Sequence, residues 1–441
     1  MPWSEKSTSS GVSTVEVFKR NGPLMFKLGI GFFADAYDLF VIDLVLAILE
    51  VLNVDDPGAI GLNANTKGLV AAATSVGAVV GMLLFGIIGD RLGRRVAILV
   101  TGTLVAVGSI ASACVQKSTA FTLSQQLCLC RFILGIGIGG EYPLSAAMAS
   151  ERSSPAIRGR VIAGVFSMQG VGMIVASLVP LIFLEAGASL EVSWRASLAL
   201  AAPPIPVALY QRFKMSESVA FTEARQGRDG SFGNQVWVFI STIGTFLVPL
   251  MGTSLSWLFM DISFYGTGEF KHSVSGDIFP SRSGREKVID AAIFAMIISF
   301  IALPGYICAC IFIDKLGRWI LQVIGFIMMI IFYVVMALCT QFNANAYLNL
   351  VVFGVTFFWT NFGPNTTTFI IPSEIFPTEV KTTCHGFSAA MGKVGAIIGT
   401  YSFPAVQEGI GLSGVMYVCA AVAAFGLGAT VIFLRRQLVE S

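Results

Sequence analysis

A short charged motif that occurs twice limits what this chain can fold into. The sequence GDRLGRR runs from Gly89 to Arg95, and a related sequence, IDKLGRW, runs from Ile313 to Trp319. A second pair of charged positions recurs at almost the same distance, because Glu151 and Glu374 lie 223 residues apart (374 − 151). Repetition over so long a distance indicates that the chain contains two copies of one structural unit.

The composition places both copies in a lipid bilayer. Hydrophobic residues make up 55% of the 441 residues, and charged residues only 12%. A helix needs about 20 apolar residues to cross the hydrocarbon core, and such stretches lie near residues 24–51, 68–89, 96–114, 122–150, 161–183, 194–210, 236–265, 288–313, 319–340, 348–372, 383–404 and 412–434. We therefore predict an all-α membrane protein with about twelve transmembrane helices in two pseudo-symmetric six-helix bundles.

The positions of the basic residues orient the chain in the membrane. If both termini are cytoplasmic, 19 of the 28 Lys and Arg residues lie on the cytoplasmic side, Arg212 among them. The positive-inside rule favours this topology. The predicted organisation is a cytoplasmic N-terminal segment (1–22), a first bundle (23–210), a polar cytoplasmic linker (211–235), a second bundle (236–434) and a cytoplasmic tail (435–441).

The sequence gives no sign of an enzyme or of a nucleic-acid-binding protein. All eight cysteines lie in or next to apolar stretches, which predicts neither a disulfide framework nor a zinc site. The glycines of GIGIGG (135–140) have the spacing of a dinucleotide fingerprint. No βαβ pattern surrounds them, so small residues at a helix interface explain them better. We therefore expect no catalytic residues, no cofactor and no metal.

Ionisable residues inside the apolar stretches indicate a polar site. Each costs about 3 kcal/mol in hydrocarbon on insertion scales, so it should face the bundle interior or a cavity. The residues concerned are Asp35, Asp38 and Asp43 in the first stretch, Arg131 and Glu141 in the fourth, Asp261 in the seventh, and His385 and Lys393 in the eleventh. For Asp43 and Asp35, a position at a water-exposed helix end is the alternative.

The repeat pairs some of these positions across the two halves. An offset of 223 residues maps Asp38 onto Asp261 and Tyr142 onto Asn365. Equivalent polar positions in the two halves predict a site between the bundles, near the middle of the membrane.

The seventh stretch carries a polar and aromatic stripe. Trp257, Asp261 and Tyr265 follow one another at four-residue spacing, so they lie on one face of a helix. The alternative is aromatic packing around an incidental acid, but a buried carboxylate needs partners. Gln169 in the fifth stretch also has two interpretations, since a buried glutamine either binds a ligand or only bridges helices.

Longer motifs resemble those of a known family. GDRLGRR and its repeat resemble the loop motif of the major facilitator superfamily. More narrowly, GGEYPLSAAMASE (139–151), WLFMDISFYG (257–266) and the run from NFGPN to CHG and GK (361–393) resemble the phosphate:proton symporters of fungi and plants. Two features depart from that family. Glu141 stands where an aspartate is usual, and the PESPR-type sequence of a shortened linker survives only as MSES (215–218).

The resemblance implies a symporter that imports inorganic phosphate, as dihydrogen phosphate, by alternating access. It implies that protons are coupled through Asp35, Asp38, Arg131 and Glu141. It implies that phosphate is bound by Tyr142, Gln169, Trp257, Asp261, Tyr265, Asn365 and Lys393, with Asn361 as the alternative to Asn365. A carboxylate at this site suits a protonated anion, because the P–OH groups of dihydrogen phosphate can donate hydrogen bonds to it and sulfate cannot.

The charged residues of the loop motifs are expected to form a cytoplasmic gate. They would pair across helices while the gate is shut and separate when the bundles rock apart. This predicted set consists of Asp90, Arg91, Arg94, Arg95, Glu151, Arg158, Arg160, Asp314, Arg318, Glu374 and Lys381.

Two other functions stay open at the level of sequence. The difference at Glu141 leaves room for an organic phosphate or glycerophosphodiester:proton symporter. A phosphate sensor that signals through its cytoplasmic segments is the other alternative, although the linker and tail offer little surface for it. We expect phosphate and protons as partners, and a multi-pass protein that functions as a monomer in the plasma membrane.

Overall fold

The computed structural model describes residues 13–118, 120–226, 240–268 and 283–438, and the regular elements in these ranges are all helices. The first half contains α1 (Thr14–Asp55), α2 (Pro57–Ile60), α3 (Ala64–Leu92), α4 (Arg94–Cys114), α5 (Leu123–Glu151), α6 (Arg158–Phe166), α7 (Met168–Glu185), α8 (Leu190–Ala199), α9 (Pro204–Phe213) and α10 (Val219–Gln226). The second half contains α12 (Leu247–Gly268), α14 (Gly284–Leu316), α15 (Arg318–Gln341), α16 (Ala346–Phe362), α17 (Pro364–Ile375), α18 (Lys381–Ala429) and α19 (Arg435–Leu438).

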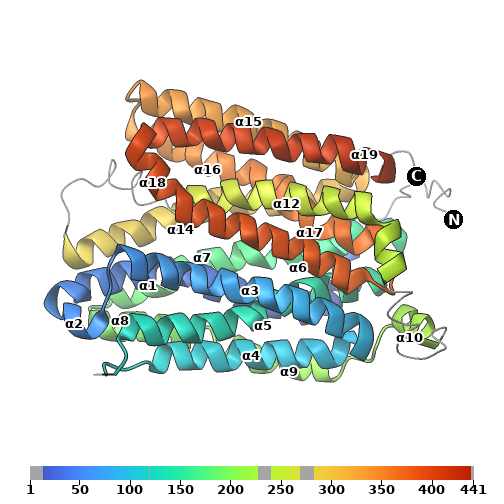
Figure 1. Ribbon diagram of the computed structural model, residues 1–441, viewed down its shortest axis with the longest axis horizontal. Coiled ribbons are helices and arrows are strands. Elements are labelled where there is room, and N and C mark those ends of the chain that lie inside the picture. The colour runs from blue at the N-terminus through green and yellow to red at the C-terminus, as the bar shows by residue number, and fades with distance from the viewer. Residues whose placement is uncertain (1–12, 119, 227–239, 269–282, 439–441) are drawn as a thin grey trace.

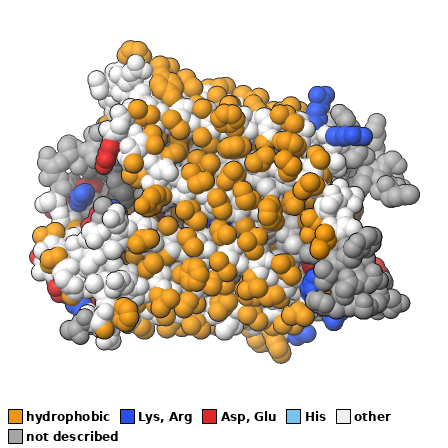
Figure 2. Space-filling view, in the orientation of Figure 1, with side chains coloured by type: hydrophobic (Ala, Val, Ile, Leu, Met, Phe, Trp, Pro, Cys, Tyr) orange, Lys and Arg blue, Asp and Glu red, His pale blue; other side chains and the backbone are white. Residues whose placement is uncertain are grey.

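The helices form two bundles that lie side by side, and the described ends of the chain lie at the same end of both (Figure 1). Hydrophobic side chains cover the middle of the face seen in Figure 2, and charged side chains lie toward its two ends. This distribution matches a hydrocarbon layer between two aqueous phases. The predicted all-α membrane architecture is confirmed.

Nine helical stretches within the described ranges are long and apolar enough to cross a membrane. α1 is not among them, since it carries three aspartates along its middle, and neither are the short helices α8 and α9. α18 covers two predicted stretches and loses helical geometry at Gly411 (φ 72°). Counting α1, the α8–α9 pair and both parts of α18 gives the number of spans predicted from the sequence.

The repeated motif has the same conformation in both halves. Gly93 separates α3 from α4 with φ 111°, and Gly317 separates α14 from α15 with φ 87°. Glycine adopts such positive φ values without the steric cost that a side chain would add. The two copies of the motif therefore make the same tight turn at equivalent places in the two bundles.

The glycines of the GIGIGG run lie at a helix interface, as predicted. A Cβ atom at Gly135 of α5 would lie 2.2 Å from the carbonyl oxygen of Thr74 in α3. A similar close approach joins the two halves, because a Cβ at Gly386 of α18 would lie 2.3 Å from the carbonyl oxygen of Met82 in α3. Small residues thus let α3 approach one helix of each bundle.

Two predicted spans are interrupted next to residues expected to bind substrate. Gly363 leaves helical geometry (φ −108°, ψ −108°) and separates α16 from α17, two residues before Asn365. Ser167, two residues before Gln169, keeps a helical backbone (φ −61°, ψ −19°), so the turn between α6 and α7 is a milder irregularity. Breaks of this kind are tolerated in a membrane where protein covers the freed backbone groups. They place both amide side chains at the start of a new helix in the middle of the protein.

Candidate functional site

Asp38 of α1 and Arg131 of α5 form a fully buried ion pair in the first bundle. The guanidinium Nη1 lies 3.4 Å from Asp38 Oδ1, and Nη2 donates to the Asp38 carbonyl oxygen. Ser109 donates to Asp38 Oδ2 at 2.6 Å, and Arg131 Nε donates to Thr74 Oγ1 at 3.1 Å. Two predicted proton-coupling residues are therefore in contact, and every charge of this pair is balanced locally.

The second acidic group contains a residue that the topology analysis placed elsewhere. Arg212, expected at the cytoplasmic surface, is only 1% exposed. Both of its terminal nitrogens donate to the Glu141 carboxylate, and the Nη2–Oε2 distance is 2.6 Å. Asp35 lies close enough to interact with both groups, and its Oδ2 atom has no hydrogen-bond partner among the described residues. Arg212 is therefore not an exposed basic residue of the linker, because its side chain points into the bundle.

Lys393 is the centre of a polar group in the second bundle. Its Nζ atom donates to the hydroxyl of Tyr265 at 2.6 Å and lies 3.4 Å from Asp261 Oδ2. It also lies over the ring of Tyr142, 5.6 Å from the ring centroid, so one residue of the first half contributes. The Tyr142 ring is 6.5 Å from the Trp257 ring. Five of the seven predicted substrate residues are thus brought together.

The other two predicted substrate residues form a second polar group across the bundles. Asn365 Nδ2 donates to Asn361 Oδ1 at 2.7 Å and lies 3.4 Å from Gln169 Oε1. Tyr306 of α14 connects them, since its hydroxyl donates to Gln169 Oε1 and accepts from Asn365 Nδ2, both at 3.1 Å. The buried Nδ2 atom of Asn361 has no hydrogen-bond partner among the described residues. No pattern in the sequence singles out Tyr306, which is an ordinary aromatic residue of an apolar stretch.

A wall of aromatic rings links the two polar groups. Phe369 lies 6.0 Å from Tyr142 and 4.7 Å from Phe166, and Phe166 lies 5.9 Å from Tyr306. His385 packs edge-on against Phe369, at 5.4 Å between the rings. Such apolar walls exclude water and strengthen the electrostatic interactions inside a site.

A cavity of about 710 Å³ opens at the end of the bundles opposite the chain ends. Both halves line it, with Asp43 and Glu50 from α1 and Thr400 and Glu408 from α18. Phe40 also lines it and stacks on the ring of Tyr265 at 6.3 Å, with an angle of 2° between the rings. This aromatic pair lies between the cavity and the amino group of Lys393.

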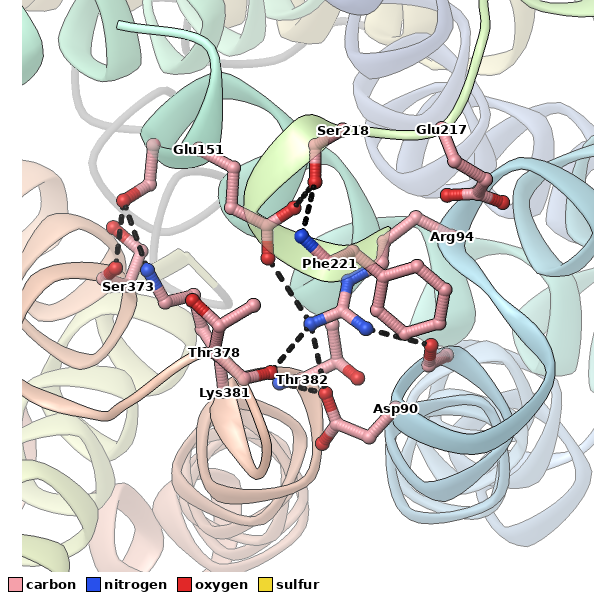
Figure 3. Close-up of polar contacts among 12 residues, drawn as sticks. Asp90, Arg94, Glu151, Glu217, Ser218, Phe221, Ser373, Thr378, Lys381 and Thr382 are labelled. Carbon is pink, nitrogen blue, oxygen red and sulfur yellow. Dashed lines mark hydrogen bonds and ion pairs between the residues drawn. The ribbon is translucent and has the colours of Figure 1, made fainter. Parts of the chain in front are cut away.

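The opposite end is closed by the first copy of the loop motif (Figure 3). Arg94 lies 3.1 Å from Asp90 Oδ1, and donates to Glu151 Oε1 at 3.0 Å and to the carbonyl oxygen of Thr378 in the second half at 2.7 Å. Asp90 accepts hydrogen bonds from the backbone N–H groups of Thr382 and Thr383, at 3.1 and 2.7 Å. These N–H groups belong to the first turn of α18, which has no side-chain cap of its own. Asp90 therefore caps a helix of the other bundle.

The second copy of the loop motif, which lies in the second half, caps a helix of the first half. Asp314 accepts from the backbone N–H of Arg160 at 3.1 Å, in the first turn of α6, and from its Nε at 2.9 Å. Arg318 lies 2.8 Å from Asp314 and donates to both oxygens of Glu374 at 2.7 Å. Each bundle thus caps a helix of the other.

The two halves of the chain contact each other at equivalent positions of the repeat. Ser150 donates to the carbonyl oxygen of Ser373 at 2.8 Å, and the two residues are 223 positions apart. Lys381 donates to Ser150 at 3.3 Å. The local pseudo-twofold axis therefore passes through this contact.

Part of the predicted linker packs on this closed end. Ser218 donates to Glu151 and caps α10 through the N–H of Phe221, whose ring lies 4.2 Å from the Arg94 guanidinium carbon. Glu217 accepts from the backbone N–H of Arg95 at 2.8 Å. The MSES segment thus supports the closed arrangement, and Arg95 bonds to the linker of its own half.

Two transmembrane bundles related by an internal repeat, with a polar site between them and a gate at one end, define a secondary transporter. The sequence model of the Major Facilitator Superfamily matches residues 28–400. The chain belongs to this superfamily. Solved structures of the proton:xylose symporter XylE share the fold. The complex with 6-bromo-6-deoxy-D-glucose has a TM-score of 0.76 at 18% identity, and covers 93% of this chain and 94% of that chain.

Curated relatives define the branch within the superfamily. The "Probable inorganic phosphate transporter 1-6" of Arabidopsis thaliana is 34% identical over 90% of this chain and 88% of its own length. The "Low affinity inorganic phosphate transporter 4" of Lotus japonicus is 35% identical over 85% of this chain and 81% of its own length. The chain belongs to this family of inorganic phosphate transporters, as its motifs predicted, and is not an enzyme.

Proposed function

We propose that this chain imports inorganic phosphate, as dihydrogen phosphate, together with protons. The observation that carries this proposal is the group in which Lys393 lies between Asp261 and Tyr265. An ammonium and a hydroxyl can donate to phosphate oxygens, and the carboxylate can accept from a P–OH group, which a fully ionised oxyanion lacks. The names of the curated relatives support the same substrate.

Phosphate would bind between the two polar groups. Tyr142, Trp257 and Lys393 would hold it from one side, and Gln169 and Asn365 from the other. These two amides hydrogen-bond to each other across the bundles, and the Nδ2 atom of Asn361, which has no partner among the described residues, offers a further donor. Binding would replace contacts between the halves by contacts to the anion, which links occupancy to the position of the bundles.

Protons would balance the charge of the anion. Moving one negative charge into a cell costs about 2.3 kcal/mol per 100 mV of membrane potential, so cotransported protons are needed for accumulation. The four acidic and basic residues implied by the family, Asp35, Asp38, Arg131 and Glu141, form the two buried groups of the first bundle. Of these, the group of Asp35 and Glu141 holds more acids than bases, so it is the better candidate to take up a proton.

The observed conformation fits the outward-facing half of a transport cycle. The outer cavity leads to the Phe40–Tyr265 pair, and the motif residues close the other end. The gate residues Asp90, Arg94, Arg160, Asp314, Arg318, Glu374 and Lys381 would separate when the bundles rock. Arg95 hydrogen-bonds to Glu217 and Phe213 of its own half, so we assign it a supporting role. Arg158 donates to the Ser153 carbonyl oxygen and lies close enough to interact with Glu374 of the second half, so we keep it in the proposed gate.

Uptake into proteoliposomes tests the proposal. Labelled phosphate should accumulate when the lumen is made alkaline, and excess arsenate should compete, whereas sulfate and glycerophosphocholine should not. Competition by glycerophosphocholine in place of arsenate would favour the organic phosphate alternative. No accumulation under the pH gradient, from protein that binds phosphate, would contradict proton coupling.

We also propose a plasma-membrane protein with both termini cytoplasmic, acting as a monomer with two bundles at 23–210 and 236–434. The distribution of basic residues supports this orientation. Residues 227–235 of the proposed linker lie outside the described ranges. Protease accessibility of tags at both chain ends in sealed cells, and the mass of the protein in detergent, test the orientation and the oligomeric state.

A further inference from the structure

Arg212 occupies a site that none of the roles above requires. It lies near the end of α9, where a lysine or arginine normally reaches the aqueous phase. Its guanidinium instead turns inward and binds both oxygens of Glu141 in α5. Burial of a cation is costly unless it is paired, so this orientation needs a local reason.

The protein provides a slot for this guanidinium. A Cβ atom at Gly31 of α1 would lie 1.9 Å from Arg212 Nη2 and 2.7 Å from Glu141 Oε2. A Cβ at Gly102 of α4 would lie 3.5 Å from Arg212 Nη1 and 3.4 Å from Glu141 Oε1. Three helices besides α9 therefore line the site. α1 makes room for the guanidinium by lacking a side chain at Gly31, whereas a Cβ at Gly102 would lie at ordinary contact distance from it.

Asp35 completes this arrangement one helical turn after Gly31. It faces the carboxylate of Glu141 and the guanidinium of Arg212, with Asp38 as the other acid nearby. Asp38 already has Arg131 as its partner. The group of Asp35, Glu141 and Arg212 thus contains two acids and one base, so its net charge is −1 when both acids are ionised and zero when it holds one proton.

We propose that Arg212 is a positioning residue of the proton site, which holds Glu141 beside Asp35 and limits the two acids to one exchangeable proton. This inference rests on the proposed proton-coupled transport. Without the guanidinium, the same pocket would hold two acids and no base, and the last proton would be released only into a more alkaline solution. Arg212 therefore lets the site discharge on the cytoplasmic side.

Two assays on the full-length protein separate this role from a general structural one. Exchange of labelled for unlabelled phosphate at equal pH measures substrate binding and rocking. Net uptake driven by an alkaline lumen requires proton release as well. We compare wild type with R212Q, R212K and G31A, the last of which keeps every charged residue but fills the slot. The control is G22A on the same helix, where a Cβ would meet no atom within 4 Å.

We expect the ratio of net uptake to exchange to fall about tenfold in R212Q and in G31A. Net uptake should return when the lumen is made about one pH unit more alkaline. R212K should give an intermediate ratio, because lysine keeps the charge but not the two-pronged contact. G22A should behave as wild type.

The inference is overturned if R212Q keeps the wild-type ratio and pH profile. It is equally overturned if exchange and net uptake fall together in R212Q and G31A, because that pattern indicates a structural salt bridge. If wild type exchanges phosphate but shows no uptake driven by pH, the proposed function itself fails, and the inference fails with it.

Discussion

Tyr306 joins two amide side chains that belong to different bundles. Its hydroxyl donates to Gln169 and accepts from Asn365, which fixes the orientation of both amides toward the centre. We predict that Y306F raises the KM for phosphate about tenfold and changes kcat about twofold or less, since the ring still packs on Phe166. Initial rates of uptake at varied phosphate concentration measure both constants.

The matched control is Y333F, which removes a buried hydroxyl in α15. Its KM should stay near the wild-type value. A tenfold fall of kcat in Y306F with an unchanged KM would contradict a positioning role in the substrate site.

Charged residues in the middle of an apolar stretch were easier to predict from the sequence than a charged residue near the end of one. Asp38, Arg131, Asp261 and Lys393 stand out in the sequence because a charge in an apolar stretch is costly and needs a reason, and the structure pairs them. Arg212 did not stand out, because an arginine near the end of a stretch normally faces water. Only the folded chain shows that its side chain turns inward.

Helix ends carry the contact between the bundles at the closed gate. Asp90 supplies two hydrogen bonds and a negative charge to the uncapped start of α18. We predict that D90N weakens the contact between the bundles at this end by about 1 to 2 kcal/mol. Such a change shifts the equilibrium between the closed and open gate about 5- to 30-fold. Spin labels at Leu92 and Leu316, which are exposed at the ends of α3 and α14, should then show a longer distance population.

The control for this experiment is D56N, which removes a charge from the N-cap of α2 at the far end of the first bundle. It should leave the distance distribution unchanged. A D90N protein with the wild-type distribution would show that the cap does not hold the gate.

The order of the spanning stretches followed from the sequence, but their interruptions did not. The stretch 348–372 was expected as a single helix, whereas the structure leaves helical geometry at Gly363. Hydropathy measures only whether a stretch is apolar, so it does not detect a break whose polar groups are covered by protein. The turns at Gly93 and Gly317 were detectable, because the repeated motif marks both.

The whole molecule combines a symmetric gate with an asymmetric centre. Asp90 caps α18 and Asp314 caps α6, so the contacts at the closed end follow the internal repeat. The centre does not, because the buried acid–base groups of Asp38 and Glu141 lie in the first bundle, and Asp261, Tyr265 and Lys393 lie in the second. Symmetry suits a gate that must open by rocking, whereas two different ligands need two different sites.

This division predicts that proton and phosphate variants differ in kind. E141Q leaves Asp35 and Arg212 as a neutral pair without a proton to exchange, so uptake driven by a pH gradient should be lost while exchange at equal pH continues. D261N replaces the charged acceptor for the P–OH group by a weaker amide oxygen and leaves Lys393 without its carboxylate, so both activities should fall on the order of a hundredfold. E50Q, in the outer cavity, is the control and should retain both. Equal losses of the two activities in E141Q and D261N would mean that the halves do not divide the work in this way.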